Sequence, residues 1–266
     1  MKISQRLQQI NQMVLGEYDH IWDCCCDHGL LGMLLLQRQA APTVHFVDCV
    51  EPIMTKLMVA LARFFPEQQA KSTSKAQASM PCDALHDNRD KQQQSCWQVH
   101  CQDVAALPLD LYGKEAKHLI IIAGVGGELL VQLVDAIVRA HRHFDLEFIL
   151  CPVHHNYFVR ESLAELGLSL KSELLLEENR RFYEILHLTN IQPQDEEALQ
   201  DALIMPAGSH MWRNLSLNAS AKAKAYLEQT IHHYQRIPEN KLTQSQRIVE
   251  SYQAVLAEVT GKGSVN

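Results

Sequence analysis

Long apolar runs are missing from this chain of 266 residues, and none approaches the about 20 residues that cross a membrane. The longest are Leu30–Leu36, which Gly32 interrupts, and Leu119–Val125. The segment from Met1 to Arg6 has no apolar core, so we expect neither a signal peptide nor contact with a membrane. Positive charge is also scarce: the net charge of -7 means that any nucleic-acid site must be local.

Two cysteine patterns are absent as well. The eight cysteines form no C-x-x-C, and three of them are consecutive at Cys24–Cys26. This arrangement suits neither a disulfide scaffold nor zinc knuckles, so we interpret the cysteines as reduced thiols of a cytoplasmic protein. His154 and His155 follow Cys151 without the spacing of zinc ligands, and we therefore expect no bound metal.

The segments that are present alternate between apolar runs, which predict strands, and amphipathic stretches, which predict helices. We predict strands at 20–24, 43–47, 97–101, 118–123 and 147–150, and helices at 3–15, 30–39, 52–65, 128–140 and 157–166. Such alternation predicts an α/β fold, a Rossmann-like parallel sheet with helices on both faces. Two last strands, 168–176 and 182–188, are expected to form a hairpin that adds an antiparallel strand at the edge.

Two segments depart from this alternation. Residues 66–95 hold six glutamines and no Ile, Val, Phe, Tyr or Trp, so we predict a mobile surface insertion. Helical patterns at 196–204, 219–237 and 242–259 predict a C-terminal helical, coiled-coil-like unit. Its charge differs too, because residues 205–266 hold seven Lys and Arg against four Asp and Glu. We therefore expect two domains, 1–190 and 195–266.

Three of the predicted strands end in a carboxylate, at Asp23, Asp48 and Asp103. Ligands of open α/β sheets bind beyond the carboxyl ends of the strands. Asp48 follows Asp23 by 25 residues, close to the spacing at which an acid binds a nucleotide ribose, and Asp103 is placed to meet an adenine edge. One such aspartate is more often a helix cap, but three in successive strands indicate a nucleotide-like ligand.

The first turn, Asp23–Gly29, lacks the G-x-G-x-x-G that holds a diphosphate. Asp27 in this turn repels phosphate and favours a cationic or zwitterionic ligand, which argues for S-adenosylmethionine over NAD or ATP. The turn Ala123–Gly127 contains three glycines, which allow a ligand to approach the backbone closely. We expect this second turn to form the floor for the reacting group.

The order of these motifs resembles the bacterial tRNA (adenine-22-N1)-methyltransferase family over roughly residues 3–188. The matching pieces are Ser4-x-Arg6-Leu7, Asp23-x-x-x-Asp27-His28, Ile122-Ala123-Gly124-Val125-Gly126-Gly127, Ile149-Leu150-Cys151-Pro152 and Glu177-Glu178-Asn179-Arg180-Arg181-Phe182-Tyr183-Glu184. The resemblance implies a class I methyltransferase fold, S-adenosylmethionine as methyl donor, tRNA as substrate and a C-terminal helical domain. Three positions depart from the family: Cys25 stands at a glycine, Val153 at an asparagine and Asp48 at a glutamate.

The candidate cofactor and catalytic residues come from the carboxylates, the two turns and their neighbours. We assign cofactor binding to Asp23, Cys25, Asp27, His28, Asp48, Cys49, Asp103, Val104, Ala123 and Gly124. Adenine N1 carries a lone pair and no proton, so catalysis is expected to rest on alignment and on stabilising the positive charge of the methylated base. We assign these catalytic roles to Asp27, His28, Gly124 and Gly126.

The candidate substrate residues are aromatic and cationic, and each has a structural alternative. We assign tRNA contacts to Tyr157, Arg160, Arg180, Tyr183, Lys222 and Lys224. Tyr157 or Phe158 would stack on the flipped base, although ordinary packing on a helix face is the more common role of such aromatic residues. Arg160 meets either a phosphate or a structural carboxylate, and scattered lysines are also typical of any soluble helix pair.

Two other functions stay open from the sequence. One is a methyltransferase that acts on another RNA, a protein or a small molecule. The other is a non-catalytic module that binds S-adenosylmethionine or RNA. A crevice that opens to a basic face favours RNA, and a closed apolar pocket favours a small molecule.

Overall fold

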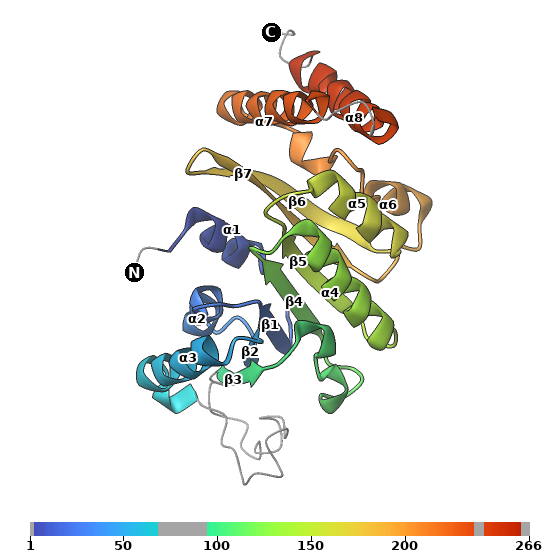
Figure 1. The fold of residues 1–266 in the computed structure, drawn as a ribbon. Helices are drawn as coiled ribbons and strands as arrows, with labels where there is room; N and C mark the ends of the chain where they lie inside the picture. The colour runs from blue at the N-terminus through green and yellow to red at the C-terminus, as the bar shows by residue number, and fades with distance from the viewer. Residues whose placement is uncertain (1–2, 69–94, 237–241, 262–266) are drawn as a thin grey trace.

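The structure, a computed structural model, describes residues 3–68, 95–236 and 242–261. Its centre is a seven-stranded sheet in the order β3-β2-β1-β4-β5-β7-β6 (Figure 1). The strands are β1 (His20–Cys24), β2 (Thr43–Asp48), β3 (Cys96–Cys101), β4 (His118–Ala123), β5 (Leu146–Cys151), β6 (Ser169–Glu178) and β7 (Arg181–Thr189). The first five run parallel, while β7 is antiparallel to both β5 and β6. The predicted Rossmann-like sheet with an antiparallel edge is confirmed.

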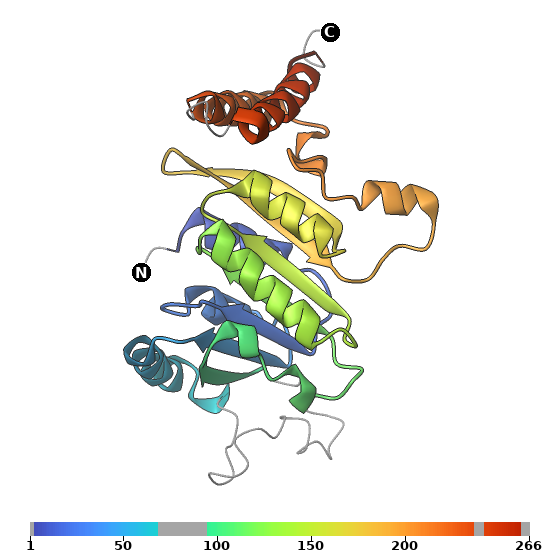
Figure 2. The same cartoon turned by 45° about the vertical axis from the view of Figure 1, so that its right-hand side comes forward.

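Helices cover both faces of this sheet (Figures 1 and 2). On one face lie α1 (Gln5–Met13), α2 (Leu30–Gln37) and α3 (Glu51–Phe64), and on the other lie α4 (Gly127–Ala140) and α5 (Asn156–Glu165). Strands buried on both faces need near-continuous apolar sequence, and the fully buried run Leu119–Ile122 of β4 meets that need. The two faces form separate apolar cores that the sheet divides.

A helical unit follows the sheet, as predicted. It begins with the short α6 (Glu196–Asp201) and ends with the pair α7 (Leu217–Gln235) and α8 (Leu242–Gly261), which lies beyond the β6–β7 edge (Figure 1). The pair packs on Tyr157 of α5 through Tyr226, Leu227 and Tyr252. Among the described residues no helix is both long and apolar enough to cross a membrane. Of the predicted insertion 66–95, only the turn Pro66–Gln68 and Ser95 lie within the described residues.

The cysteines are mostly thiols. Six of them are free, at positions 24, 25, 26, 49, 101 and 151. For these six the interpretation as thiols is confirmed, and Cys82 lies outside the described residues.

Histidines from neighbouring strands form a buried hydrogen-bonded chain that the sequence reasoning did not single out. His20 Nδ1 lies 3.1 Å from His45 Nε2, and His45 Nδ1 lies 3.0 Å from His100 Nε2. Trp22 stacks on His45 and donates its indole N–H to His118 Nδ1 at 3.1 Å. Burial lowers the pKa of His100 to about 4 and that of His118 to about 3. The rings of His100 and His118 are therefore neutral at pH 7.

The histidine chain predicts loss of stability in acid. The pKa of His100 is lower in the folded than in the unfolded protein, so its contribution is present above pH 6.5 and is lost as the pH falls towards 4. Between pH 7.5 and pH 5 this costs about 2 kcal/mol. Over that interval the free energy of unfolding of His100→Gln should fall by about 2 kcal/mol less than that of the native protein, as measured by urea unfolding at each pH.

The matched control is His143→Gln, which changes an exposed histidine paired with Asp110. This variant should keep the native pH dependence. An identical pH dependence in His100→Gln and the native protein would show that His100 is not held neutral by the fold.

Candidate functional site

A hollow of about 200 Å³ lies at the carboxyl ends of β1 and β4. Twelve residues line it: Arg6, Leu7, Asp23, Cys25, Cys26, Asp27, His28, Leu30, Leu31, Ala123, Gly124 and Val125. The two predicted turns thus meet across one cavity, because β1 and β4 are neighbours in the sheet. This is the position where parallel α/β sheets bind ligands.

Asp23 is the buried carboxyl group of this hollow, with 5% of its surface exposed. Its Oδ2 accepts a hydrogen bond of 2.8 Å from the backbone N–H of Gly32 in α2. Burial raises the pKa of Asp23 to about 7, against the opposing effect of that hydrogen bond and with a further rise from the charge of Asp48. Near neutral pH the group is therefore poised to ionise when a cation enters the hollow.

The turn after β1 is held in an unusual backbone conformation. Cys25 and Asp27 have φ values of 53° and 47°, in the left-handed region that favours glycine. The Asp27 N–H donates to Asp48 Oδ2 at 3.3 Å, and Asp48 Oδ1 accepts from the Val50 N–H at 3.0 Å. Cys25 thus takes up a glycine-like conformation without glycine, at a cost of about 1–2 kcal/mol, and the carboxylate of Asp48 fixes the turn.

The thiols of this turn are not poised as nucleophiles. Burial, followed by the charge of Asp48, raises the pKa of Cys25 to about 11, and burial also raises the pKa of Cys24 and Cys26. Nucleophilic thiols have a lowered pKa. The three cysteines therefore act here as small packing side chains.

Four of the predicted cofactor residues, Asp48, Cys49, Asp103 and Val104, lie outside the lining of the hollow, whereas His28 lines it. Asp48 supports the turn from β2, and Cys49 beside it is exposed. Asp103 caps the turn Val104–Ala106 by accepting from the Ala105 N–H at 2.9 Å, and Val104 is buried in the core under α4. His28 lies beside Asp27, with 3.7 Å between His28 Nε2 and Asp27 Oδ1, and both side chains are exposed.

Arg6 is a site residue that the sequence reasoning did not assign to a role. Ser4 caps α1 by accepting from the Leu7 N–H at 3.2 Å, and this helix carries Arg6 to the hollow. The guanidinium lies 5.0 Å from the ring centre of Tyr183 and faces Gly124. Among the lining residues Arg6 is the only Lys or Arg. The Ser4-x-Arg6-Leu7 motif was the available signal.

A second groove, of about 290 Å³, runs between the N-terminal end of α5, β7 and the α7–α8 pair. Aromatic and histidine side chains dominate its lining: His154, His155, Tyr157, Phe182, Tyr226, His233, Tyr234 and Tyr252. Tyr157 is 2% exposed and packs against Tyr252, so packing describes this side chain better than base stacking. Phe158, in contrast, is 41% exposed.

Arg160 does not face a substrate, which corrects its assignment as a tRNA contact. The side chain is fully buried, with Nε 2.6 Å from Glu184 Oε2 and Nη2 2.6 Å from Glu173 Oε2. Burial lowers the pKa of Arg160, but the two carboxylates outweigh it and hold that pKa above its usual value. Tyr226 of α7 donates its hydroxyl to Glu184. Arg160 therefore pairs with structural carboxylates, which is the alternative that the sequence left open.

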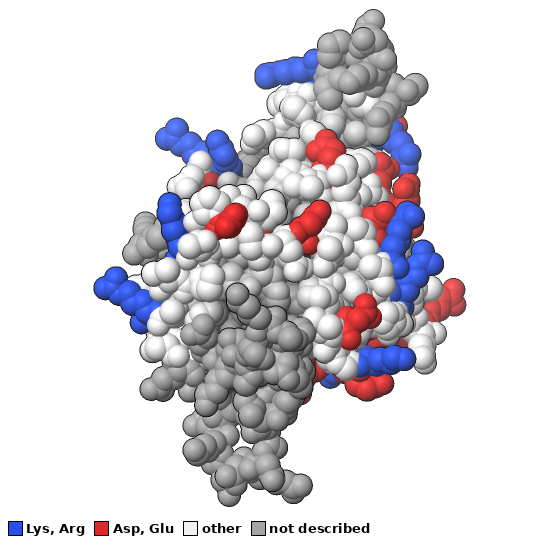
Figure 3. All heavy atoms as spheres, turned by 60° about the horizontal axis from the view of Figure 1, so that its bottom comes forward, with Lys and Arg blue, Asp and Glu red and all other residues white. Residues whose placement is uncertain are grey.

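The remaining cationic candidates lie on the surface. Arg180 sits in the turn between β6 and β7 with φ 61°, and both Lys222 and Lys224 lie on α7. Lys222 is 3.7 Å from Glu177, and Lys224 is 3.8 Å from Glu228. Half-exposed pairs of this kind leave the lysines available to a phosphate, because such pairs contribute little stability. Figure 3 shows the β3 end of the molecule, where the described Lys and Arg lie mainly along the outline, with Asp and Glu among them.

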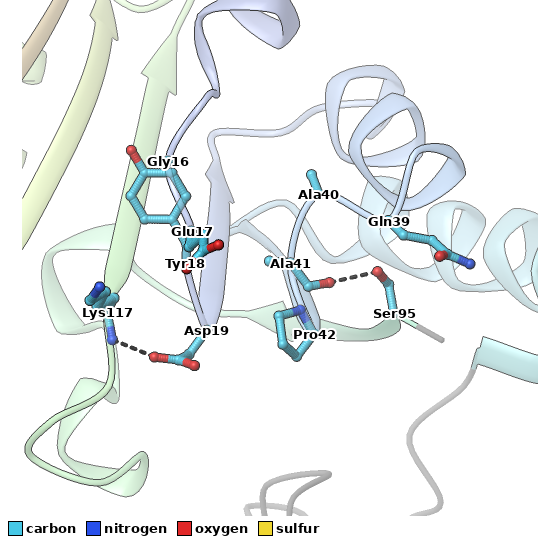
Figure 4. A pocket seen from close by; sticks show the side chains of 10 residues that line it. All are labelled: Gly16, Glu17, Tyr18, Asp19, Gln39, Ala40, Ala41, Pro42, Ser95 and Lys117. Atoms are coloured by element: carbon cyan, nitrogen blue, oxygen red, sulfur yellow. Dashed lines mark hydrogen bonds between the residues drawn. The ribbon is translucent and has the colours of Figure 1, made fainter. Parts of the chain in front are cut away.

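A third hollow, of about 470 Å³, opens at the opposite, amino-terminal ends of the strands (Figure 4). Two of its polar side chains already have partners: Asp19 accepts from the Lys117 N–H at 2.8 Å, and Ser95 donates to the Ala41 carbonyl at 2.6 Å. Parallel sheets bind ligands at the other end of their strands. We therefore place the candidate active site in the hollow between β1 and β4.

Comparison with known proteins bears on the fold. The model of the methyltransferase domain family matches residues 3–76 and 68–186. The solved m1A22 tRNA methyltransferase TrmK of B. subtilis is 19% identical, with a TM-score of 0.60 over 96% of this chain and 99% of that chain. TrmK of M. capricolum, solved with S-adenosyl-homocysteine, is 14% identical, with a TM-score of 0.63 over 97% and 99%. A comparison with curated proteins finds no match. The likeness confirms the predicted class I methyltransferase fold.

The buried carboxyl group of Asp23 gives a stability test of the site. Its pKa is higher in the folded than in the unfolded protein, so its contribution is present at low pH and is lost as the pH rises through about 7. The loss between pH 5 and pH 8 is on the order of 3 kcal/mol. Asp23→Asn has no such titration, and urea unfolding should show about 3 kcal/mol less decline over this interval than in the native protein.

Asp135→Asn is the control, since Asp135 pairs with Arg139 on the surface of α4. It should follow the native profile. If Asp23→Asn also followed the native profile, Asp23 would be ionised in the folded protein and the description of the hollow would be wrong.

Proposed function

We propose that this chain, which belongs to the methyltransferase domain family, uses S-adenosylmethionine to methylate N1 of an adenine in tRNA. The observation that carries the proposal is the pairing of two cavities: an acidic hollow at the β1–β4 end and an aromatic groove beside a helical pair. The first fits the cofactor and the second fits an extended partner.

Charge complementarity matches each charged group of the cofactor to a side chain of the hollow. S-adenosylmethionine carries a sulfonium, an ammonium and a carboxylate, and the hollow offers Asp23 and Asp27 for the cations and Arg6 for the carboxylate. Asp48, at the end of β2, is the acid for the ribose hydroxyls. Asp103, at the end of the neighbouring β3, is the acid on the side of the adenine.

The chemistry requires little of the protein beyond positioning. Adenine N1 attacks the methyl carbon of the sulfonium, the carbon–sulfur bond breaks, and S-adenosylhomocysteine leaves as a neutral thioether. No proton is removed to start the reaction, so alignment supplies most of the acceleration. The product base carries a positive charge, which the carboxylate of Asp27 and the carbonyl groups of Gly124 and Gly126 would stabilise.

The groove and the hairpin suit a macromolecular acceptor. The groove carries partly exposed rings from β7 and α7, those of Phe182, His233 and Tyr234, and such rings stack on unpaired bases. Arg180 at the hairpin tip and Lys222 and Lys224 on α7 add local positive charge. A closed apolar pocket, which a small acceptor would require, is not what lines this region of the described chain.

The first experiment compares the native protein with Asp48→Ala in calorimetric titration with S-adenosylmethionine and in transfer of labelled methyl groups to bulk tRNA. Loss of hydrogen bonds to a charged acceptor costs about 1.5–3 kcal/mol, or roughly 10- to 150-fold in affinity. We expect the dissociation constant to rise by that factor and methyl transfer to fall with it.

Asp110→Ala serves as the control, because Asp110 is an exposed carboxylate that pairs with His143 and does not line the hollow. It should leave both readouts unchanged. Native binding without transfer to any RNA would support a non-catalytic module, and transfer to protein or to a small molecule would contradict the tRNA proposal. No binding, with or without tRNA, would contradict the assignment of the hollow.

A further inference from the structure

Two histidines and a glutamate meet at the rim of the proposed substrate groove. His154 and His155 come from the turn between β5 and α5, and Glu128 comes from the first turn of α4. One ligand atom from each of the three lies within 4.8 Å of the other two. The side chains are about half exposed, and α4 packs beside α5 (Figure 1). The set is therefore accessible to ions from solvent.

The backbone is shaped to bring these groups together. Neighbouring residues in an extended segment point to opposite sides, but His155 has φ 63° and ψ 35°, in the left-handed region. Its ring and that of His154 have their centres 4.4 Å apart. A non-glycine residue held in this region often marks a functional site.

The glycine turn after β4 makes room for the pair. A Cβ atom on Gly126 would lie 2.8 Å from Cε1 of His154, and one on Gly127 would lie 2.8 Å from the His154 carbonyl oxygen. Glycine at both positions therefore lets the histidine turn pack directly on the start of α4. The same packing carries the rings to the Glu128 carboxylate.

We propose that Glu128, His154 and His155 form a binding site for a divalent transition-metal ion of the zinc type. Two imidazole nitrogens and a carboxylate oxygen are a donor set that zinc accepts. With bonds of about 2.1 Å, donors on a tetrahedral ion lie roughly 3.4 Å apart, so small rotations of half-exposed side chains close the set. The ion replaces the hydrogen bond between Glu128 and His155. Three protein ligands leave a fourth position for water or an anionic oxygen.

The spacing of residues in the sequence does not indicate this site. In the sequence the nearest possible third ligand to His154 and His155 is Cys151, but Cys151 is buried in β5 and belongs to the core on the α1–α3 face of the sheet. The third donor is instead Glu128, which lies 26 residues earlier and on another helix. Only the parallel β4–β5 pair brings those two turns side by side.

Equilibrium titration of the metal-free protein with Zn²⁺, and with Co²⁺ as a coloured substitute, tests the site. We expect one ion per chain and a visible Co²⁺ absorption band typical of bound nitrogen and oxygen ligands. His155→Ala and Glu128→Gln should each weaken binding at least tenfold and remove the band. Because these side chains are exposed, circular dichroism should show both variants folded.

The matched control is His143→Ala, which removes an exposed, ion-paired histidine at the other end of α4. It should bind one ion with native affinity. Absence of saturable binding in the native protein would overturn the proposal. Equal affinity in the native protein, His155→Ala and Glu128→Gln would do the same, because it would place the ion elsewhere. Neither readout depends on methyl transfer.

Discussion

The buried arginine of α5 joins the sheet to the helical pair, and the arrangement of the two cavities depends on it. Arg160 pairs with Glu173 of β6 and Glu184 of β7, and Glu184 accepts from Tyr226 of α7. Removing one partner from a buried ion pair costs about 3–5 kcal/mol, because it leaves an uncompensated charge. Four elements are therefore held in one geometry. A helical pair fixed in this way gives the groove a constant position relative to the hollow between β1 and β4.

Burial also sets the protonation states of side chains in and near the hollow between β1 and β4. The same desolvation that keeps the histidine chain neutral keeps Asp23 partly protonated near neutral pH. A cationic ligand that enters the hollow reverses this balance, since it favours the carboxylate. In the function proposed above, Asp23 links cofactor binding to proton release, while the exposed Asp27 is available to the substrate side of the hollow.

Local pattern was enough to predict the sheet, its antiparallel edge and the C-terminal helices, because strand and helix periods follow directly from which side chains are buried. It was also enough to bring Asp23, Asp27 and Gly124 to one cavity, since the carboxyl ends of parallel strands share one edge. It did not distinguish a surface arginine from Arg160, whose two carboxylates lie on strands that follow it in the chain. Nor did it find Arg6 or Glu128, because their partners are brought near only by tertiary packing.

The identity of the methylated nucleoside tests the central claim most directly. Unmodified tRNA transcripts would be incubated with the protein and S-adenosylmethionine, digested to nucleosides and examined by mass spectrometry. The proposed geometry and chemistry predict N1-methyladenosine at a single position, lost when that adenine is replaced by guanine. A methyl group on another base or on another atom of adenine would contradict the claim.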